Sequence, residues 1–322
     1  MACINLKTGY ASEQIPRTVL GLGNFDGVHL AHQELLKTVR VVAERCNRES
    51  VTEEDSAYLP VRPAVWTFAR PSSDYLSVAP VGHLCTLDER LELFAKFGIE
   101  YAFVEDFESF REVEAEDFVE RELKERCRAV KVVCGYNFRF GAGGAGTPRT
   151  LEKDGFGIVM PRKTKMGGTI SSSRIRWTLR AGDAELATSL LGRPYSLSGI
   201  VEHGRGLGHN LGMPTLNLRF GPDILIPRRG VYVTEVAFSD HRYAAVTNIG
   251  FRPSVEQGAS LNCESHLLDF SGDLYGAEIR VSFLRRLRDE KQFSDLLQLR
   301  EQMTQDAKQA RDYYSMHEHN AK

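Results

Sequence analysis

The first half of the chain alternates short β-branched or aromatic runs with segments whose apolar residues recur at helical spacing. The runs predict strands over residues 18–22, 64–68, 101–104 and 129–134. The helical spacing predicts helices around residues 35–42, 91–95 and 118–123. Strands separated by helices indicate a parallel sheet covered on both faces. Because ligands of such sheets lie beyond the carboxyl ends of the strands, the turns after Leu22, Phe68 and Cys134 are the places to search for a site.

The pattern changes near Gly192. A helical pair over residues 174–181 and 183–191 is followed by strand-like runs at residues 198–201, 231–238, 243–249, 261–270 and 277–283. Consecutive strands without helices predict an antiparallel sandwich or barrel. A closing helix over residues 293–314 carries one apolar stripe, formed by Phe293, Leu296, Met303, Ala307, Ala310 and Tyr314. We expect this stripe to pack on the barrel, the alternative being a helix that binds a partner.

Length and composition narrow the classes of function. The chain has 322 residues, which at about 150 residues per domain favours two domains. Its 41 basic and 43 acidic residues give a net charge of −2, so no general positive field attracts nucleic acid or anionic lipid. No apolar stretch approaches the ~18 residues of a membrane-spanning helix, and the chain does not begin with a signal-peptide pattern, so we expect a cytoplasmic protein. The six cysteines lie far apart and are expected to be reduced thiols.

The segment Gly-Asn-Phe-Asp-Gly-Val-His-Leu-Ala-His, residues 23–32, leaves a predicted strand and enters a predicted helix. His29 and His32 are three residues apart on the first helical turn and therefore share one face. The free backbone N–H groups and the positive end of the helix dipole beside them suit an anion such as a triphosphate. The spacing alone leaves open that both histidines are ordinary polar surface residues.

Two further clusters follow in the first half. Gly-Tyr-Asn-Phe-Arg-Phe-Gly, residues 135–141, comes directly after a strand and leads into a glycine-rich loop. Such a loop either brings backbone amides close to a ligand or is a lid without contacts. Ile-Ser-Ser-Ser-Arg-Ile-Arg, residues 170–176, begins a helix. Its hydroxyls either cap the helix or bind phosphate oxygens together with Arg174 or Arg176, whose guanidinium groups suit phosphate.

Taken in this order, the three clusters resemble the adenylyltransferase module of the bacterial bifunctional riboflavin kinase/FAD synthetases, a Rossmann-like nucleotidyltransferase. The resemblance implies that the FMN phosphate attacks the α-phosphorus of ATP and releases pyrophosphate. Such chemistry needs positioning and charge stabilisation more than a covalent nucleophile. The site residues that the resemblance implies are Asn24, Phe25, Asp26, His29 and His32 around ATP, Ser172, Ser173 and Arg176 on its phosphates, and Asn137 near the transferring groups.

Two positions in this half depart from the family pattern. The family has glycine where this chain has Ala31, which favours the helix by roughly 1 kcal/mol and alters only the space beside the nucleotide. The family follows its Thr-Phe with an acidic residue and Pro-His-Pro, whereas residues 67–72 here read Thr-Phe-Ala-Arg-Pro-Ser. One lost charge-assisted hydrogen bond corresponds to about ten- to a hundredfold in binding or rate. The sequence therefore leaves open a weakly active module.

The second half carries a phosphate-loop pattern. Residues 204–217 read Gly-Arg-Gly-Leu-Gly-His-Asn-Leu-Gly-Met-Pro-Thr-Leu-Asn. The glycines permit a tight loop over phosphates, and Thr215 and Asn217 point the same way if the segment is extended, offering two neutral oxygens to one cation. Mg²⁺ keeps several waters and binds nucleotide phosphates, so it needs few protein ligands. By itself the segment is equally compatible with a plain loop and turn.

This segment resembles the phosphate loop and Pro-Thr-Ala-Asn signature of riboflavin kinases, and five more family motifs follow in order at residues 227–232, 248–254, 264–270, 273–276 and 287–290. The resemblance implies ATP contacts for Gly204, Gly208, Gly212, Pro214 and Thr215, magnesium contacts for Thr215 and Asn217, and a flavin contact for Arg288. It makes Glu264 the general base that takes the proton of the ribityl 5′-hydroxyl. Without the family, Glu264 reads as a solvent-facing strand carboxylate and His266 as a structural residue. His209 stands where the family has arginine, and Ser254 where it has threonine.

The resemblance covers residues 17–315. It predicts an α/β Rossmann-like FMN adenylyltransferase domain over residues 1–186, followed by an antiparallel β-barrel riboflavin kinase domain with a C-terminal helix over residues 187–322. The expected reactions convert riboflavin to FMN and FMN to FAD, with Mg²⁺, ATP and flavins as ligands, no nucleic-acid or membrane partner, and at most weak self-association. The alternatives are a riboflavin kinase with a degenerate adenylyltransferase module, and a non-catalytic regulator that binds flavin or nucleotide.

Overall fold

The structure, a computed structural model, describes residues 1–4, 15–50, 60–78, 81–202, 215–252 and 260–318. The chain divides into two compact units, Met1–Ser172 and Ser173–Lys322. The boundary expected between residues 186 and 187 falls within helix α8 (Ala184–Leu191), and the limits of the functional domains stay a prediction.

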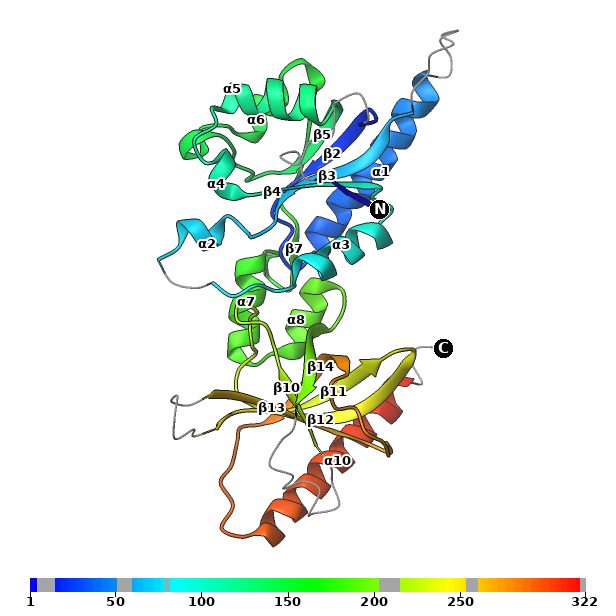
Figure 1. The fold of residues 1–322 in the computed structure, drawn as a ribbon, viewed down its shortest axis with the longest axis vertical. Coiled ribbons are helices and arrows are strands. Elements are labelled where there is room, and N and C mark those ends of the chain that lie inside the picture. The colour runs from blue at the N-terminus through cyan, green and yellow to red at the C-terminus, as the bar shows by residue number, and fades with distance from the viewer. Residues whose placement is uncertain (5–14, 51–59, 79–80, 203–214, 253–259, 319–322) are drawn as a thin grey trace. The chain divides into compact units, whose positions relative to one another are not determined.

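The first unit contains a six-stranded, fully parallel sheet in the order β1-β4-β3-β2-β5-β6 (Figure 1). Its strands are β1 (Ala2–Ile4), β2 (Thr18–Leu22), β3 (Arg62–Phe68), β4 (Tyr101–Glu105), β5 (Ala129–Gly135) and β6 (Gly157–Met160). A separate hairpin pairs β7 (Thr164–Lys165) with β8 (Gly168–Thr169). All four predicted strands are present. The hydrophobic pattern missed β1 and β6, which are short and lie at the two edges of the sheet.

Helices cover both faces of this sheet (Figure 1). The helical segments are α1 (Leu30–Ser50), α2 (Ser73–Leu76), α3 (Leu87–Lys96), α4 (Phe107–Phe110), α5 (Ala115–Asp117), the π-helix η3 (Phe118–Arg126), the 3-10 turn η4 (Ala142–Gly144), α6 (Pro148–Leu151) and the 3-10 turn η5 (Lys153–Gly155). On one face α1 and α3 bury Leu36 and Phe94 in a common apolar cluster. On the other face α4, η3 and α6 bury Phe110, Leu123 and Leu151. The predicted two-sided covering is therefore confirmed.

A capping box fixes the start of α3. Thr86 Oγ1 accepts the N–H of Glu89 at 3.2 Å, and the Glu89 carboxylate accepts the N–H of Thr86 at 3.0 Å. This reciprocal pair satisfies two of the free donors at the helix start. Lys96 in the last turn complements the helix dipole at the other end. The capping box thereby fixes the residue at which α3 begins.

The second unit is built on a closed antiparallel barrel with strand order β10-β13-β12-β11-β14-β9. After α7 (Ser172–Ala181) and α8 come β9 (Tyr195–Glu202), β10 (Leu216–Arg219), β11 (Gly230–Phe238), β12 (His241–Arg252), β13 (Ser260–Leu267) and β14 (Glu278–Arg288). The predicted helical pair and barrel are confirmed. The pattern did not predict β10 as a strand, because only four residues of it are paired.

The last helix, α10 (Leu296–Glu318), packs on the barrel. Ala307 and Ala310 are buried with Val233 and Leu268, and partly buried tyrosines extend the cluster. The helix begins three residues later than predicted because the Asp295 carboxylate accepts the N–H of Gln298 at 2.9 Å, as an N-cap does. Of the predicted apolar stripe, the second half, Ala307, Ala310 and Tyr314, packs on the barrel.

Within the described residues, Cys46, Cys85, Cys127, Cys134 and Cys263 form no disulfide. Burial raises the pKa of the Cys134 thiol to about 12 and also raises the pKa of the thiols of Cys127 and Cys263. A thiol with a raised pKa holds its proton at pH 7, which makes these three side chains unreactive core residues. Within the described ranges, no helix is long and apolar enough to cross a membrane.

Candidate active sites

The first candidate site lies at the carboxyl edge of the parallel sheet. Because β2 lies between β3 and β5, the segments that follow Leu22, Phe68 and Gly135 leave the sheet side by side. Two of these segments begin sequence clusters singled out above. The fold thus brings residues 23–32 and 135–141 to one edge.

The turn after β2 has a strained backbone. Phe25, Gly27 and Val28 have φ angles of 52°, 78° and 39°. A left-handed backbone at Phe and Val persists only where the surroundings fix it, and such strain gathers at functional sites. The Phe25 ring is fully buried and packs edge-on against Phe94 and His32, with ring centroids 5.2 Å apart in both pairs. The Phe25 side chain therefore supports the loop from inside the core.

The two histidines of this loop are stacked. The rings of His29 and His32 lie 3.6 Å apart between centroids, with 16° between their planes. Nδ1 of His29 accepts the N–H of His32 at 3.3 Å, which leaves the His29 proton to Nε2. Burial, then the neighbouring His29 and then Arg90 lower the pKa of His32 well below its ordinary 6.5. His32 is therefore a neutral imidazole at pH 7.

The acidic and amide side chains of the loop hold neighbouring segments. Asp26 Oδ1 accepts the N–H of Leu84 at 2.9 Å, and the Ser172 hydroxyl donates to the Asp26 carbonyl at 2.9 Å. The Asn24 amide donates to Ser72 Oγ at 2.9 Å and accepts the Ser72 N–H at 3.3 Å. The first cluster is thus joined to the beginning of the third cluster and to the segment after β3.

The remaining predicted residues of this site are more scattered. Asn137 is exposed in a turn that the N–H of Phe138 closes on the Gly135 carbonyl at 3.0 Å. Ser173 and Arg176 lie on α7 and belong to the second unit, Ser173 exposed and Arg176 buried. A common site for these two residues and the first-unit loops stays a prediction.

The second candidate site lies on the barrel. Asn217 of β10 pairs with Glu264 of β13, and Glu264 pairs with Asn248 of β12. Directly paired residues project on the same face of a sheet, with Cβ atoms about 4.5–5.5 Å apart. Two amides and one carboxylate therefore form a row across three strands.

Buried hydroxyls show which face of the barrel carries this row. Thr247 Oγ1 lies 2.7 Å from Thr234 Oγ1 and 2.8 Å from Ser265 Oγ, and all three side chains are fully buried. Their strand neighbour Val233 packs outward against α10, so the three hydroxyls fill the interior. Since side chains alternate along a strand, Glu264 projects outward next to Ser265. The hydroxyl ladder fixes the register of β12 against β13, two of the three strands that carry the row.

Thr215 precedes β10 directly, two residues before Asn217, and is partly buried. The other predicted kinase residues Gly204, Gly208, Gly212 and Pro214 lie outside the described residues, as do His209 and Ser254. Of the phosphate-loop pattern over residues 204–217, the structure therefore describes only the last three residues, 215–217.

Comparison with known proteins accounts for both units. A family model for FAD synthetase matches residues 11–174, and one for riboflavin kinase matches residues 191–314. The bifunctional riboflavin kinase/FMN adenylyltransferase of Bacillus subtilis is 32% identical over 312 residues, which cover 94% of each chain. The Escherichia coli K12 enzyme of the same name is 33% identical over 305 residues, 92% of this chain and 93% of that one. The chain belongs to the bifunctional riboflavin kinase/FMN adenylyltransferase family.

A solved structure supports the fold over nearly the whole length. The crystal structure described as a macrolide-efflux protein from Streptococcus pneumoniae matches with a TM-score of 0.84 and 29% identity, covering 97% of this chain and 99% of that chain. The family assignment confirms the predicted pair of activities, riboflavin kinase and FMN adenylyltransferase, with ATP and flavins as their ligands. The family assignment favours this pair of activities over the two alternatives, a degenerate first module and a non-catalytic regulator.

Sequence reasoning gave no role to Glu290. Asn248 Nδ2 donates to Glu290 Oε1 at 3.4 Å, so a second carboxylate lies next to the Asn217–Glu264–Asn248 row. The signal was present, since residues 248–254 and 287–290 were both recognised as family motifs. Only the fold shows that the two motifs meet.

The guanidinium of Arg288 is held by α10. Its Nε and Nη2 form a bidentate pair with the Asp306 carboxylate, with the shortest bond at 2.7 Å, and its Nη1 donates to the Asp289 carbonyl at 3.0 Å. Asp306 is almost fully buried. The edges of this guanidinium are therefore engaged within the protein, and its flat face is what remains for a ligand.

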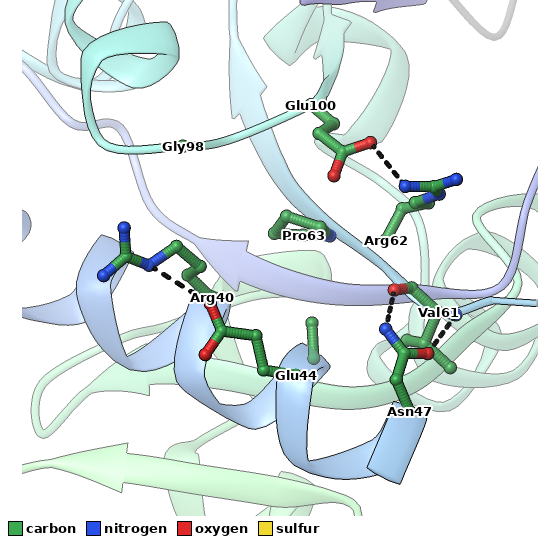
Figure 2. Close-up of a pocket in the computed structure, with 9 residues that line it drawn as sticks. Arg40, Glu44, Asn47, Val61, Arg62, Pro63, Gly98 and Glu100 are labelled. Carbon is green, nitrogen blue, oxygen red and sulfur yellow. Dashed lines mark hydrogen bonds and ion pairs between the residues drawn. The ribbon is translucent and has the colours of Figure 1, made fainter. Parts of the chain in front are cut away.

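A separate pocket lies at the opposite edge of the first sheet, between α1 and the starts of β3 and β4 (Figure 2). Its volume of about 170 Å³ is below the ~300 Å³ of ordinary small-molecule sites. Its charged side chains form two ion pairs, Arg40 with Glu44 at 3.6 Å and Arg62 with Glu100 at 3.3 Å. The pocket therefore offers no unpaired charge to a nucleotide.

Proposed function

We propose that the second unit carries out the kinase reaction with Glu264 as the general base. The terminal ribityl hydroxyl of riboflavin gives its proton to the Glu264 carboxylate while its oxygen attacks the γ-phosphorus of ATP, and ADP leaves. The observation that carries this proposal is the pairing of Glu264 with Asn217 on one side and Asn248 on the other. A proton acceptor then stands beside neutral polar groups that suit a cation and phosphate oxygens.

Thr215 and Asn217 have the chemistry of a magnesium site that holds a nucleotide. They offer a hydroxyl and an amide oxygen, both neutral, at the entry to β10. A magnesium ion bound with ATP needs few protein ligands because phosphate oxygens and waters complete its coordination. When bound, the ion neutralises charge on the transferring phosphoryl group. ATP contacts of Gly204, Gly208, Gly212 and Pro214 rest on the family pattern.

A flavin contact of Arg288 would use the flat face of its guanidinium. The pair with Asp306 holds this plane in one orientation, and guanidinium planes stack on aromatic rings. We therefore assign Arg288 to the isoalloxazine ring rather than to a phosphate, which would require the engaged N–H edges.

In the first unit, the proposed reaction joins the FMN phosphate to the α-phosphorus of ATP and releases pyrophosphate. His32, which is neutral at pH 7, and His29, whose Nδ1 accepts the N–H of His32, would each donate a ring N–H to phosphate oxygens next to the positive end of α1. Asn24, Asp26 and the buried Phe25 hold the loop in shape. Phosphate contacts of Ser172, Ser173 and Arg176, and a place near the transferring groups for Asn137, rest on the family pattern.

A single reaction mixture tests both proposals. Purified chain with riboflavin, ATP and Mg²⁺ is expected to form FMN first and FAD later. Glu264→Gln should lower FMN formation by at least about a hundredfold, because the proton acceptor is lost, and should still form FAD from supplied FMN. Glu278→Gln, at an exposed carboxylate on another barrel strand, is the matched control and should behave as the wild type. A Glu264→Gln chain with normal kinase activity would overturn the assignment of the base.

A further inference from the structure

A buried cation connects two segments at the carboxyl edge of the first sheet. Arg90 of α3 is only 3% exposed. Its Nη1 donates to the Asn24 carbonyl at 2.7 Å, and its Nη2 donates to the Ala69 carbonyl at 2.7 Å. Nη1 also lies 3.4 Å from Thr67 Oγ1. One side chain therefore reaches the turn after β2 and the segment after β3 at the same time.

The charge of Arg90 is satisfied by carbonyl oxygens. Among the described residues, no carboxylate forms an ion pair with it, and its Nε has no hydrogen-bond partner. Burial lowers the pKa of Arg90, while Cys85 and Asp26 act in the opposite direction. Burying a guanidinium is costly unless its donors are used. Here Nη1 and Nη2 bind two loop carbonyls while Nε makes no hydrogen bond, so the burial is only partly compensated and its bonds go to the segments that shape the edge.

The two carbonyls that Arg90 binds belong to segments that are tied together a second time. The Asn24 side chain, whose carbonyl Arg90 holds, exchanges two hydrogen bonds with Ser72, three residues after Ala69. The Asn24 backbone is thus hydrogen-bonded to α3, and its side chain is hydrogen-bonded to the segment after β3. This is also the segment in which the sequence departs from the family's Pro-His-Pro.

From this geometry we infer that Arg90 is a positioning residue for adenylyl transfer: it sets the separation of the β2 turn and the post-β3 segment, between which the nucleotide triphosphate is bound. The inference rests on the proposed function of the first unit. Arg90 does not need to touch ATP, because the loop that carries His29 and His32 begins at the carbonyl that it holds.

Arg90 has a second effect through its charge. His32 faces two groups that disfavour its protonation, the stacked His29 and the guanidinium of Arg90. Arg90 in turn faces Asp26 and Cys85. Removing the positive charge takes away one of the groups that keep His32 neutral, whereas a lysine would retain it. Geometry and charge can therefore be separated by two substitutions.

The test compares Arg90→Gln and Arg90→Lys with the wild type in the full chain, using the kinase reaction of the same molecules as the reference. Arg90→Gln should lower kcat/KM for ATP in FAD formation from FMN by roughly ten- to a hundredfold, through a raised KM, and leave riboflavin phosphorylation unchanged. Arg90→Lys should lower it less. The acid limb of the pH profile for FAD formation should move to higher pH in Arg90→Gln and stay in place in Arg90→Lys.

Arg40→Gln is the matched control, because Arg40 belongs to the same unit but pairs with Glu44 at the exposed opposite edge (Figure 2). It should match the wild type in both reactions. Equal FAD formation by Arg90→Gln and wild type overturns the inference, as does a loss confined to kcat with the pH limb unmoved, which is the behaviour of a purely structural residue. A wild-type chain that forms no FAD from FMN overturns the proposed function of the first unit and this inference with it.

Discussion

Gly250 lies against the carboxylate of Glu290, so closely that a methyl group on its Cα would overlap Oε1. The φ angle of Gly250 is not in the left-handed region, so this approach, and not backbone freedom, accounts for glycine at the position. Glu290 also accepts a hydrogen bond from Asn248, the neighbour of Glu264. Glycine at position 250 thus leaves room for the Glu290 carboxylate beside the Asn217–Glu264–Asn248 row.

Gly250→Ala should therefore reproduce the effect of removing Glu290. The added methyl group displaces the flexible Glu290 side chain and costs little stability, but it breaks the bond to Asn248. We expect Gly250→Ala and Glu290→Ala each to lower kinase kcat/KM by about two- to tenfold, the range of one ordinary hydrogen bond, and the double variant to be no worse than either. Gly221→Ala, where the nearest atom is 4.0 Å away, is the control. Additive effects in the double variant would contradict this account.

Asn217→Ala should weaken the magnesium dependence of the kinase reaction. The substitution removes a neutral oxygen directly opposite Glu264 while keeping the β10 backbone. We expect the Mg²⁺ concentration for half-maximal FMN formation to rise by at least about tenfold, the value of one charge-assisted bond. Arg219→Ala, two residues further along β10 on the same face, loses only an exposed ion pair with Glu202 and should leave the titration unchanged. An unaltered Mg²⁺ titration in Asn217→Ala would remove Asn217 from the metal site.

The elements of the fold that could be predicted from the sequence are those determined by residues close together in the chain. Hydrophobic period and turn residues predicted the central parallel strands, the barrel and the closing helix, because alternation and amphipathic spacing are local properties. They missed β10, whose four residues are defined by their partners β9 and β13, and they placed the start of α10 early because an Asp295 cap outweighs the apolar pattern.

The same distinction between local and long-range causes holds for the side chains of the candidate sites. Family motifs predict Asn24, Asp26, His29 and Glu264 as site residues because those residues lie within recognisable runs. Arg90 lies on an ordinary amphipathic helix, and its partners Asn24 and Ala69 are 66 and 21 residues away. The partner of Arg288 is likewise on another element, 18 residues later. Long-range polar contacts of this kind leave no period in the sequence, so only the fold reveals them.

Asp306→Ala should destabilise the second unit. Asp306 is 2% exposed and forms a bidentate pair with Arg288, so its removal leaves a guanidinium without its counter-charge. Breaking a buried pair from one side costs about 3–5 kcal/mol. The urea midpoint for loss of kinase activity should therefore fall by at least about 1 M. Asp269→Ala breaks an exposed pair between the barrel end and α10, with Arg311, and should cost under about 1 kcal/mol. Equal shifts in the two variants would show that burial of the Arg288 pair is unimportant.

The stability of the first unit should fall in mild acid because of His32. Its pKa is lowered in the folded chain, so below the ordinary value of 6.5 the unfolded chain binds a proton that the folded chain does not. The stabilisation is complete above about pH 6.5 and is lost as the pH falls, by up to about 1.4 kcal/mol per pH unit. Trp66, buried in this unit, reports its urea unfolding once the exposed Trp177 is replaced by phenylalanine.

In this Trp177→Phe background, His32→Asn replaces the imidazole with a neutral amide that does not titrate. The variant loses the ring stacking on His29, so it should be less stable at pH 7.5, yet its free energy of unfolding should fall less steeply between pH 6.5 and pH 5. The slope is therefore the decisive quantity, because loss of packing shifts stability equally at every pH whereas loss of a titrating group changes its pH dependence. Parallel curves for the two chains would mean that His32 protonates as readily in the folded unit as in the unfolded chain, which its burial beside His29 and Arg90 argues against.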